Sequence, residues 1–302
     1  MKKNLNKLNL FLELFQKGQI PNCYLEIKNR GENILKNNIK DEKKNSLVHS
    51  HSLCPNYLEY LVNEDVYKLT KVKQANKGYA IDISEIKNIQ AYMESHMSRS
   101  FRKAIRQSVR RLEDGFKISY RMLGHNILES DYISLFDQLR EMLDKRFEQK
   151  NEKDEKLSQW LQIKNDFYES LKNKKANIFV IYNADIPISI SLNYLSNNMI
   201  FCWISSYNTD YGRFSLGHVD LYKHVEWCFE NNYGLIELGY GDHDYKSKWS
   251  NIVYNFEHHV LSKRNSFSGF ILGKIEYGKV YLKEFLKHKG VVVFLKSLKK
   301  SN

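Results

Sequence analysis

The sequence predicts an α/β fold of the α+β type, in which a mostly antiparallel sheet is flanked by helices. Two observations lead to this prediction. Three strand patterns joined by short turns follow one another between residues 176 and 207. Amphipathic helical patterns come before them, and one more helix and one more strand come after them.

The composition indicates a folded chain, large enough for one large domain or two of ordinary size. Of 302 residues, 42% are hydrophobic and 13% are aromatic, more aromatic residues than a disordered chain has. No apolar run approaches the roughly 20 residues of a membrane span, and the N-terminus has no signal-peptide core, so we expect a cytoplasmic protein. The four cysteines form no CxxC pair, which argues against a disulfide framework and a structural zinc site.

The charge of the chain suits an anionic partner. Lys and Arg number 47 against 35 Asp and Glu, which gives a formal net charge of +12. Nucleic acid, a lipid head-group surface and a polyphosphate cofactor all fit this charge, and so does an ordinary solvated surface. Charge therefore leaves the partner open.

The first 80 residues are the least informative part of the chain. Short apolar runs alternate with polar interruptions, and residues 37 to 45 are typical of an exposed loop. Residues 79 to 83 then have a strand pattern, and Ser84 predicts the cap of a helix that begins at Glu85.

A basic amphipathic helix is predicted over residues 98 to 112. Its apolar residues recur at three-to-four spacing, and Gly115 stands where a C-terminal cap belongs. Its other face is densely basic, with Arg99, Arg102, Lys103, Arg106, Arg110 and Arg111. Such a face could bind nucleic acid, membranes or CoA phosphates, although most basic helix faces are simply solvated.

The remaining elements follow from periodicity. The patterns predict strands over 116 to 122, 176 to 182, 186 to 194, 199 to 207 and 234 to 238, and helices over 129 to 149, 155 to 172 and 217 to 231. Residues 208 to 216 are expected to form a loop. Near the C-terminus, residues 270 to 287 and the stretch after Gly290 are amphipathic and basic, which suits a core-packing helix with a basic tail or contact with an anionic membrane.

The first motif that could support chemistry is the junction between this loop and the next helix. It consists of Arg213, Ser215, Leu216, Gly217 and His218. The N-terminus of a helix presents unpaired N–H groups and a partial positive charge, and a glycine there allows a pyrophosphate to approach the backbone. An ordinary helix start has the same residue types.

The second motif is the polar run that follows the strand at 235 to 238. Two glycines, Gly239 and Gly241, are followed by a compressed series of polar residues: Asp242, His243, Asp244, Tyr245, Lys246, Lys248 and Trp249. Active sites favour such loops at strand ends. The run is not a dinucleotide fingerprint, because Asp244 stands where the third glycine belongs and no amphipathic helix is predicted after it.

A metal site is not expected from the sequence. His49, His51 and Cys54 lie close together, but no residue at matching spacing completes four ligands.

In this order, the segments resemble the GNAT (Gcn5-related) acyltransferases, in the branch of the CelD or BioF2-like acetyltransferase domain. The stretch from Ser98 to Arg106 looks like the opening helix of that family, and Ser215-Leu216-Gly217 looks like its Ser-Pro-Gly helix start, with Leu in place of Pro. The run from Glu237 to Trp249 matches its Gly-x-Gly-Asp-x-x-Tyr-Lys-x-x-Trp signature, although Glu237 stands where the family has Asp. The resemblance covers residues 80 to 260.

The resemblance implies a GNAT fold with a mixed, mostly antiparallel central sheet, in two tandem GNAT-like halves as in the related FemAB-type transferases. Residues 1–125 would then be a degenerate first half, 126–265 the acyltransferase domain and 266–302 a basic helical extension. The implied donor is acetyl-CoA or a longer acyl-CoA, and no metal is implied. The donor would bind at Arg213, Ser215, Leu216, Gly217 and His218. The acceptor would be an amine of a small metabolite, sugar or lipid precursor.

The family mechanism implies a base, an acid and binding residues. His243 or Asp242 would be the base, Tyr245 the acid, and Lys246 would hold an anionic group. Substrate contacts would come from Trp203, Glu237, Gly241 and Trp249. Two alternatives stay open: a FemAB-like enzyme that takes aminoacyl-tRNA, and a non-catalytic protein that binds RNA or membranes on the same fold.

Overall fold

The structure, a computed structural model, describes residues 4–36, 46–150 and 158–289. The chain divides into two compact units. Unit 1 holds residues 1–78, 240–242 and 253–302, and unit 2 holds residues 79–239 and 243–252. These units differ from the three ranges expected from the sequence, because the chain returns to the first unit after residue 252.

Unit 1 is built mainly of strands. Its larger sheet has the order β1-β4-β12-β6, and its smaller sheet the order β3-β2-β5. β1 is parallel to β4, whereas β12 is antiparallel to β4. The elements are β1 (Leu5–Asn9), α1 (Leu10–Phe15), β2 (Tyr24–Asn29), β3 (Glu32–Lys36), β4 (Val48–Pro55), β5 (Glu59–Val62), β12 (Ile252–Lys263), α8 (Phe267–His288) and most of β6 (Tyr67–Asp82).

Helix α8 packs closely against β12 through glycines. A Cβ atom on Gly273 would stand 2.8 Å from the Cβ of Ser262, so only glycine fits there at this distance. The same buried face of α8 holds Gly269, Val280 and the carboxylates of Glu276 and Glu284. The opposite face of α8 exposes aromatic and aliphatic side chains. No helix in the described residues is long and apolar enough to cross a membrane.

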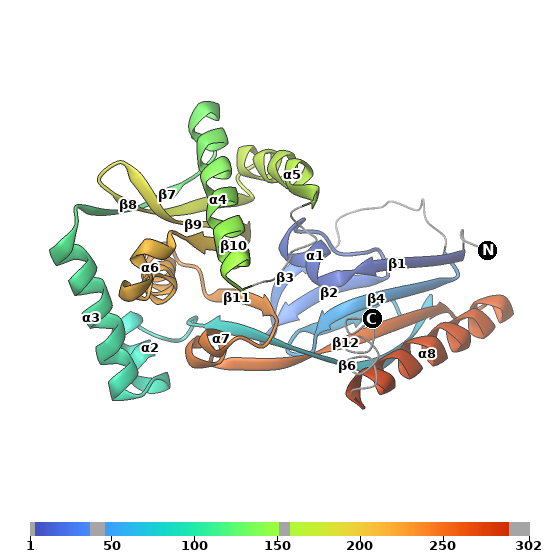
Figure 1. The fold of residues 1–302 in the computed structure, drawn as a ribbon. Helices are drawn as coiled ribbons and strands as arrows, with labels where there is room; N and C mark the ends of the chain where they lie inside the picture. The colour runs from blue at the N-terminus through green and yellow to red at the C-terminus, as the bar shows by residue number, and fades with distance from the viewer. Residues whose placement is uncertain (1–3, 37–45, 151–157, 290–302) are drawn as a thin grey trace, which may run out of the picture. The chain divides into compact units, whose positions relative to one another are not determined.

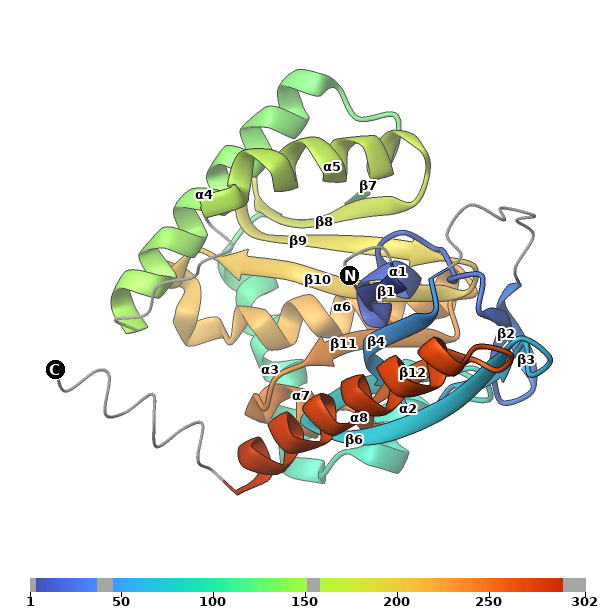
Figure 2. The ribbon, with the colours of Figure 1, turned by 90° about the vertical axis from the view of Figure 1, so that its right-hand side faces the viewer.

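Unit 2 is a sheet between two layers of helices (Figures 1 and 2). The strand order is β11-β10-β9-β8-β7, all antiparallel neighbours except the parallel pair of β10 and β11. Helices α4 and α5 cover one face, and α6, with α3 beyond it, covers the other. The elements are α2 (Ile89–His96), α3 (Arg99–Gly115), β7 (Ile118–Leu123), α4 (Glu129–Lys150), α5 (Trp160–Lys172), β8 (Ala176–Asn183), β9 (Ile186–Ser196), β10 (Met199–Tyr207), the 3-10 helix η3 (Thr209–Phe214), α6 (Leu216–Glu230), β11 (Leu235–Tyr240) and α7 (Asp244–Trp249).

The mixed α/β architecture and the meander of β8, β9 and β10 confirm the prediction from periodicity. Ser98 caps helix α3, because its hydroxyl accepts a hydrogen bond from the Phe101 N–H. Helix α3 continues through Gly115, and Phe116 takes the capping position.

Three local predictions were wrong. Ser84 does not start a helix, because its N–H and hydroxyl both bond to Asp82, and α2 begins only after Asn88. The expected loop over 208 to 216 contains η3. A short helix, α7, does open after the glycines of the second motif. The predicted loop at 37 to 45, the start of the predicted helix at 155 and the tail after Gly290 lie outside the described residues.

Candidate active site

The parallel strands β10 and β11 separate part of the way along their length. Their registered pairs run from Met199 with Leu235 to Phe201 with Glu237. At that level β10 contains one extra residue, Trp203, between the positions that pair with β9. Such a bulge bends a strand and increases its twist. The edge of β10 beyond Phe201 is therefore available to a ligand.

Helix α6 begins beside this opening after an unusual residue. Ser215 adopts a left-handed conformation (φ 52°, ψ 46°) between η3 and α6, and its side chain makes no cap hydrogen bond. Leu216 and Gly217 are the first residues of the helix, where N–H groups lack partners within it. A Cβ on Gly217 would meet only the Tyr207 ring, at 3.8 Å. The helix start is thus open to an anion.

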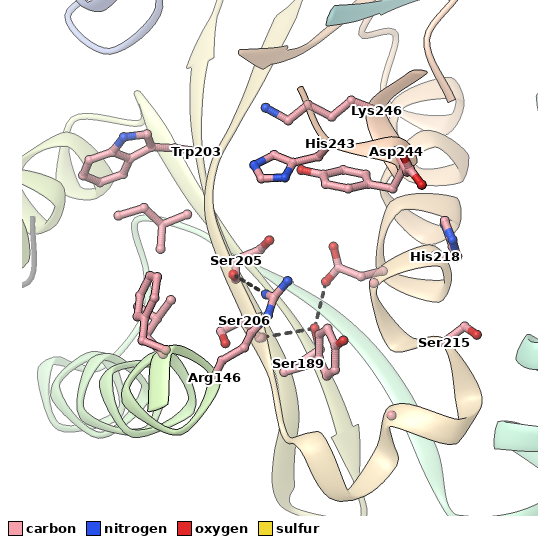
Figure 3. Close-up of a pocket in the computed structure, with 18 of the residues that line it drawn as sticks. Arg146, Ser189, Trp203, Ser205, Ser206, Ser215, His218, His243, Asp244 and Lys246 are labelled. Carbon is pink, nitrogen blue, oxygen red and sulfur yellow. Dashed lines mark hydrogen bonds between the residues drawn. The ribbon is translucent and has the colours of Figure 1, made fainter. Parts of the chain in front are cut away.

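A cavity of about 710 Å³ joins the opened strands to this helix start. Figure 3 shows His243 and Lys246 reaching from the α7 side toward β10, with His218 on α6 and Ser215 just before that helix. The lining residues are Leu143, Arg146, Phe147, Trp160, Ile163, Ser189, Trp203, Ile204, Ser205, Ser206, Tyr207, Gly212, Ser215, Gly217, His218, Asp220, His243, Asp244, Tyr245 and Lys246.

One wall of the cavity contains a buried carboxylate. Asp220 of α6 accepts hydrogen bonds from the hydroxyls of Ser189 and Ser191 at 3.0 to 3.1 Å. The Nδ1 atom of His224 lies 3.1 Å from the same carboxylate, and its Nε2 atom lies 3.0 Å from the Asn193 amide nitrogen. Because both imidazole nitrogens and both carboxylate oxygens have partners, this wall is fixed in place.

The α7 segment supplies groups that can exchange protons. The rings of His243 and Tyr245 are stacked, with centroids 6.1 Å apart. Although Tyr245 is 38% exposed, its pKa is raised to about 12, chiefly by partial burial and also by the nearby Cys202 and Asp220, against the opposing effect of Arg146. Tyr245 therefore stays protonated near neutral pH and can donate a hydrogen bond. Lys246 is only 5% exposed, although it lines the cavity.

The cavity mouth also has a cation from α4. The Arg146 guanidinium lies over the Tyr207 ring at 5.0 Å, and one of its nitrogens donates to the Ser205 carbonyl at 3.5 Å. His218 has its pKa lowered, mainly by burial and also by Lys248, and its Nδ1 accepts a hydrogen bond from the Trp249 indole. Cationic charge in the cavity wall therefore comes from arginine and lysine.

The structure brings together eight of the residues singled out in the sequence. The cavity is lined by Ser215, Gly217, His218, Trp203, His243, Asp244, Tyr245 and Lys246. Other predicted residues lie elsewhere. Leu216 and Trp249 are in the core, and the exposed Arg213 lies over the Phe214 ring. The buried Glu237 accepts a hydrogen bond from the Gly239 N–H, and Gly241 and Asp242 belong to unit 1.

Sequence reasoning missed Arg146, Asp220 and the serines of β9 and β10. Asp220 follows the helix start by five residues, a position where polar residues are common. Arg146 is one of several charged residues on α4, and only the fold places it at the cavity. A buried polar stripe on β9, with Ser189, Ser191 and Asn193 alternating with aliphatic residues, was the one available signal.

Comparison with known proteins gives a family and a fold. Residues 99–247 match the model of the family described as an acetyltransferase (GNAT) domain. A search of curated proteins gives no significant match.

Among solved structures, FemX matches with a TM-score of 0.51 at 10% identity, over 72% of this chain and 72% of that one. L-PGS from Bacillus licheniformis gives a TM-score of 0.46 at 10% identity, over 75% and 72% of the two chains. A conserved protein of unknown function from Bacteroides thetaiotaomicron gives 0.46 at 11% identity, over 71% and 70%. The likeness to FemX is one of fold.

Proposed function

Residues 99–247 belong to the acetyltransferase (GNAT) domain family, and we propose that the chain is an acyltransferase. The donor is acetyl-CoA or a longer acyl-CoA, and the acceptor is an amine of a small metabolite, sugar or lipid precursor. The observation that supports this most directly is the cavity between the diverging strands β10 and β11, next to the open start of α6.

The proposed donor fits the cavity in two places. Its pyrophosphate binds at the exposed N–H group of Gly217 in the first turn of α6, where the helix dipole favours negative charge. Arg146 at the cavity mouth adds a cation. The thioester lies along β10 beyond Phe201, where backbone N–H groups polarise its carbonyl oxygen.

The transfer itself forms one C–N bond and breaks one C–S bond. His243 removes a proton from the acceptor amine, whose nitrogen then attacks the thioester carbon. The tetrahedral intermediate collapses, and the departing CoA sulfur takes a hydrogen bond and then a proton from Tyr245. Lys246 stabilises negative charge in the buried part of the cavity. Asp220 fixes the wall against which the acceptor binds.

The experiment that tests the proposal measures CoA thiol release and the shift in unfolding midpoint. A ligand at about 100 times its Kd stabilises a protein by roughly 2.7 kcal/mol, so acetyl-CoA and longer acyl-CoAs should raise the midpoint by several degrees. With an accepted amine, His243→Ala and Tyr245→Phe should each lower kcat/KM by about 10²- to 10⁴-fold.

Matched substitutions control for nonspecific damage. His125→Ala and Tyr281→Phe change the same residue types at exposed positions outside the cavity and should leave turnover unchanged. No midpoint shift with any acyl-CoA would refute the donor assignment. Full turnover in both cavity variants would refute the assigned roles.

A second candidate donor is aminoacyl-tRNA, which the exposed basic face of α3 would suit. Arg99, Lys103, Arg106, Arg110 and Arg111 are all exposed on this helix. An RNA-bound donor would lose affinity steeply with salt, by about 0.7 to 0.9 units of log K per neutralised phosphate per unit of log salt. Acyl-CoA binding that persists at high salt would favour the first proposal.

We also propose that α8 contacts an anionic membrane surface, which suits a lipid acceptor. Its open face exposes Phe267 (80%), Phe270 (49%) and Leu282 (57%), next to Lys274, Lys279 and Lys283. Apolar and basic side chains on one exposed helix face are typical of helices that lie in the head-group region.

Vesicle sedimentation tests this contact. The chain should bind vesicles that contain phosphatidylglycerol and not pure phosphatidylcholine. The pair Phe267→Ser and Phe270→Ser should abolish binding, whereas Ile186→Ser, which changes a residue 64% exposed in unit 2, should not. Equal binding by the double variant would refute a role for α8.

Finally, we propose that the part of the chain before the catalytic domain descends from a second GNAT-like half. Its support is the set of strands that this part contributes to unit 1, among them the parallel pair of β1 and β4. An experimental structure whose unit 1 strands cannot be superimposed on those of unit 2 in a common order would refute it.

A further inference from the structure

Three potential metal ligands meet inside unit 1. His49 and His51 are two residues apart on β4, so strand geometry puts both imidazoles on one face of the sheet. Cys23 comes just before β2 and reaches the same place from another part of the chain. One ligand atom of each side chain lies within 4.8 Å of one from each of the others, and the exposed fractions are 0%, 5% and 0% for Cys23, His49 and His51.

Both histidines of this group have a ring nitrogen that makes no hydrogen bond. The Nε2 atoms of His49 and His51 are both buried and have no hydrogen-bond partner. Leaving a buried polar atom without a partner is costly, and most such groups in folded proteins are satisfied by protein, water or an ion. Two such nitrogens beside a buried thiol are the donor set that a metal ion would satisfy.

A chain of hydrogen bonds prepares His51 to accept such a ligand. The Glu257 carboxylate lies 3.1 Å from Nε2 of His259 and 3.0 Å from the Lys71 ammonium. Its pKa is lowered by these partners, first by the His259 hydrogen bond, so it is ionised and fixes a proton on that nitrogen. Nδ1 of His259 must then accept the hydrogen bond from the Tyr24 hydroxyl, 3.0 Å away.

The Tyr24 hydroxyl in turn determines which nitrogen of His51 carries the proton. Because its hydroxyl proton points to His259, its oxygen accepts from Nδ1 of His51, also at 3.0 Å. The proton of His51 is therefore on Nδ1, which leaves the buried Nε2 with a lone pair that no hydrogen bond uses. Histidines that bind metals are held in this way, with the second ring nitrogen donating to a neighbouring group.

His49 has a partner that can play the same part. The side-chain amide nitrogen of Asn6, the residue registered opposite His49 on β1, lies 3.4 Å from its Nδ1 atom. Rotating this amide by half a turn presents its oxygen as the acceptor for an Nδ1 proton, which leaves Nε2 as the ligand.

We propose that Cys23, His49 and His51 bind a zinc ion that ties β4 to the segment before β2. Thiolate and imidazole are the ligands zinc prefers, and three protein ligands leave the fourth tetrahedral position for a water or a small anion. Zinc bonds of about 2.0 to 2.3 Å place ligand atoms roughly 3.3 to 3.8 Å apart, so each side chain moves inward by about 1 Å or less.

Protonation of the three groups fits this assignment. Burial lowers the pKa of His49 to about 4 and that of His51 well below its usual range, so both imidazoles are neutral at physiological pH. Burial also raises the pKa of Cys23 to about 12, so the thiol keeps its proton until an ion arrives. Zinc binding therefore releases this proton to solvent and leaves a thiolate.

The first test uses the full wild-type chain and needs no assay of activity. After removal of metals with a chelator and return of zinc, one zinc per chain should remain through gel filtration and raise the unfolding midpoint. Cobalt(II) in place of zinc should give the absorption of a tetrahedral site with a thiolate-to-cobalt charge-transfer band. A folded chain that retains no zinc, or a cobalt spectrum without a thiolate band, would overturn the proposal.

Variants then assign the ligands. Cys23→Ser should remove the thiolate band and at least 100-fold of zinc affinity, whereas Cys228→Ser, a change at an equally buried cysteine of unit 2, should keep both. Tyr24→Phe keeps the ring but removes the hydroxyl that orients His51, and should weaken zinc binding by about 10- to 100-fold. Unchanged affinity in Cys23→Ser would refute the site even if Tyr24→Phe failed to fold.

Discussion

Asp220 in unit 2 and His51 in unit 1 are both buried, and each belongs to a network of hydrogen bonds. The two networks end differently. Around Asp220, each carboxylate oxygen and each nitrogen of His224 has a partner. The chain through Tyr24 ends at Nε2 of His51, which has none. The first network is closed around its carboxylate and holds a cavity wall in place, although Asn193 at its far end keeps an Oδ1 atom without a partner. The second is open at an imidazole nitrogen and marks where a ligand can bind.

The largest effect is expected from opening the closed network. Asp220→Ala leaves two serine hydroxyls and His224 buried without their acceptor, so it should lower the free energy of unfolding by about 3 to 5 kcal/mol. Urea unfolding of the full chain measures this. Asp185→Ala, in an exposed turn, should cost less than about 0.5 kcal/mol. A cost below 1 kcal/mol for Asp220→Ala would show that the network does not hold the wall.

The second effect concerns a histidine that burial keeps neutral in unit 1. The pKa of His258 is lowered to about 4, chiefly by burial, against the attraction of Glu276 and Glu284. Between pH 6.5 and 4 this histidine binds a proton in the unfolded chain but not in the folded chain. The free energy of unfolding should therefore fall as pH falls through this range. A shift of this size corresponds to at most about 3 kcal/mol.

Urea unfolding at pH 7 and pH 5 in the presence of EDTA would measure this loss without a contribution from metal. His258→Gln should remove part of the difference between the two pH values, and His125→Gln, at an exposed position, should not. Glu276 and Glu284 have lowered pKa values and so affect stability only below about pH 4.5. An unchanged pH dependence in His258→Gln would contradict the assignment.

The smallest effect separates the two faces of α8. Gly273→Ala places a methyl group 2.8 Å from Ser262 and should cost about 1 to 3 kcal/mol. Gly278→Ala meets nothing within 4 Å and should stabilise the helix by up to about 1 kcal/mol. Opposite signs in thermal unfolding would confirm that only the first face is packed. The same sign for both would show that helix propensity alone decides.

Much of unit 2 could be predicted from sequence because its elements are local. The period-two run from Ile186 to Tyr194 and the helical spacing in α3 and α4 are set by short-range patterns. The polar run after β11 was recognisable for the same reason, and four of its residues, His243 to Lys246, do line the cavity.

The rest could not be predicted because it depends on pairing between distant segments. Asp220 acquires its role only when α6 packs over the serines of β9, about 30 residues earlier in the chain. Cys23 joins His49 and His51 across 26 residues, at no spacing that a zinc motif would show. Unit 1 itself is completed by β12 and α8 from the far end of the sequence.

The bulge at Trp203 has a consequence for how such a cavity can be gained or lost. One residue separates an interrupted β10 from a regular one, because Cys202 and Ile204 pair with the adjacent residues Asn193 and Leu192. Loss of a single codon there would restore continuous pairing with β9, and we expect such a deletion variant to stay folded while acyl-CoA no longer shifts its unfolding midpoint. Ligand binding in this fold would then depend on the length of a strand as much as on the side chains along it.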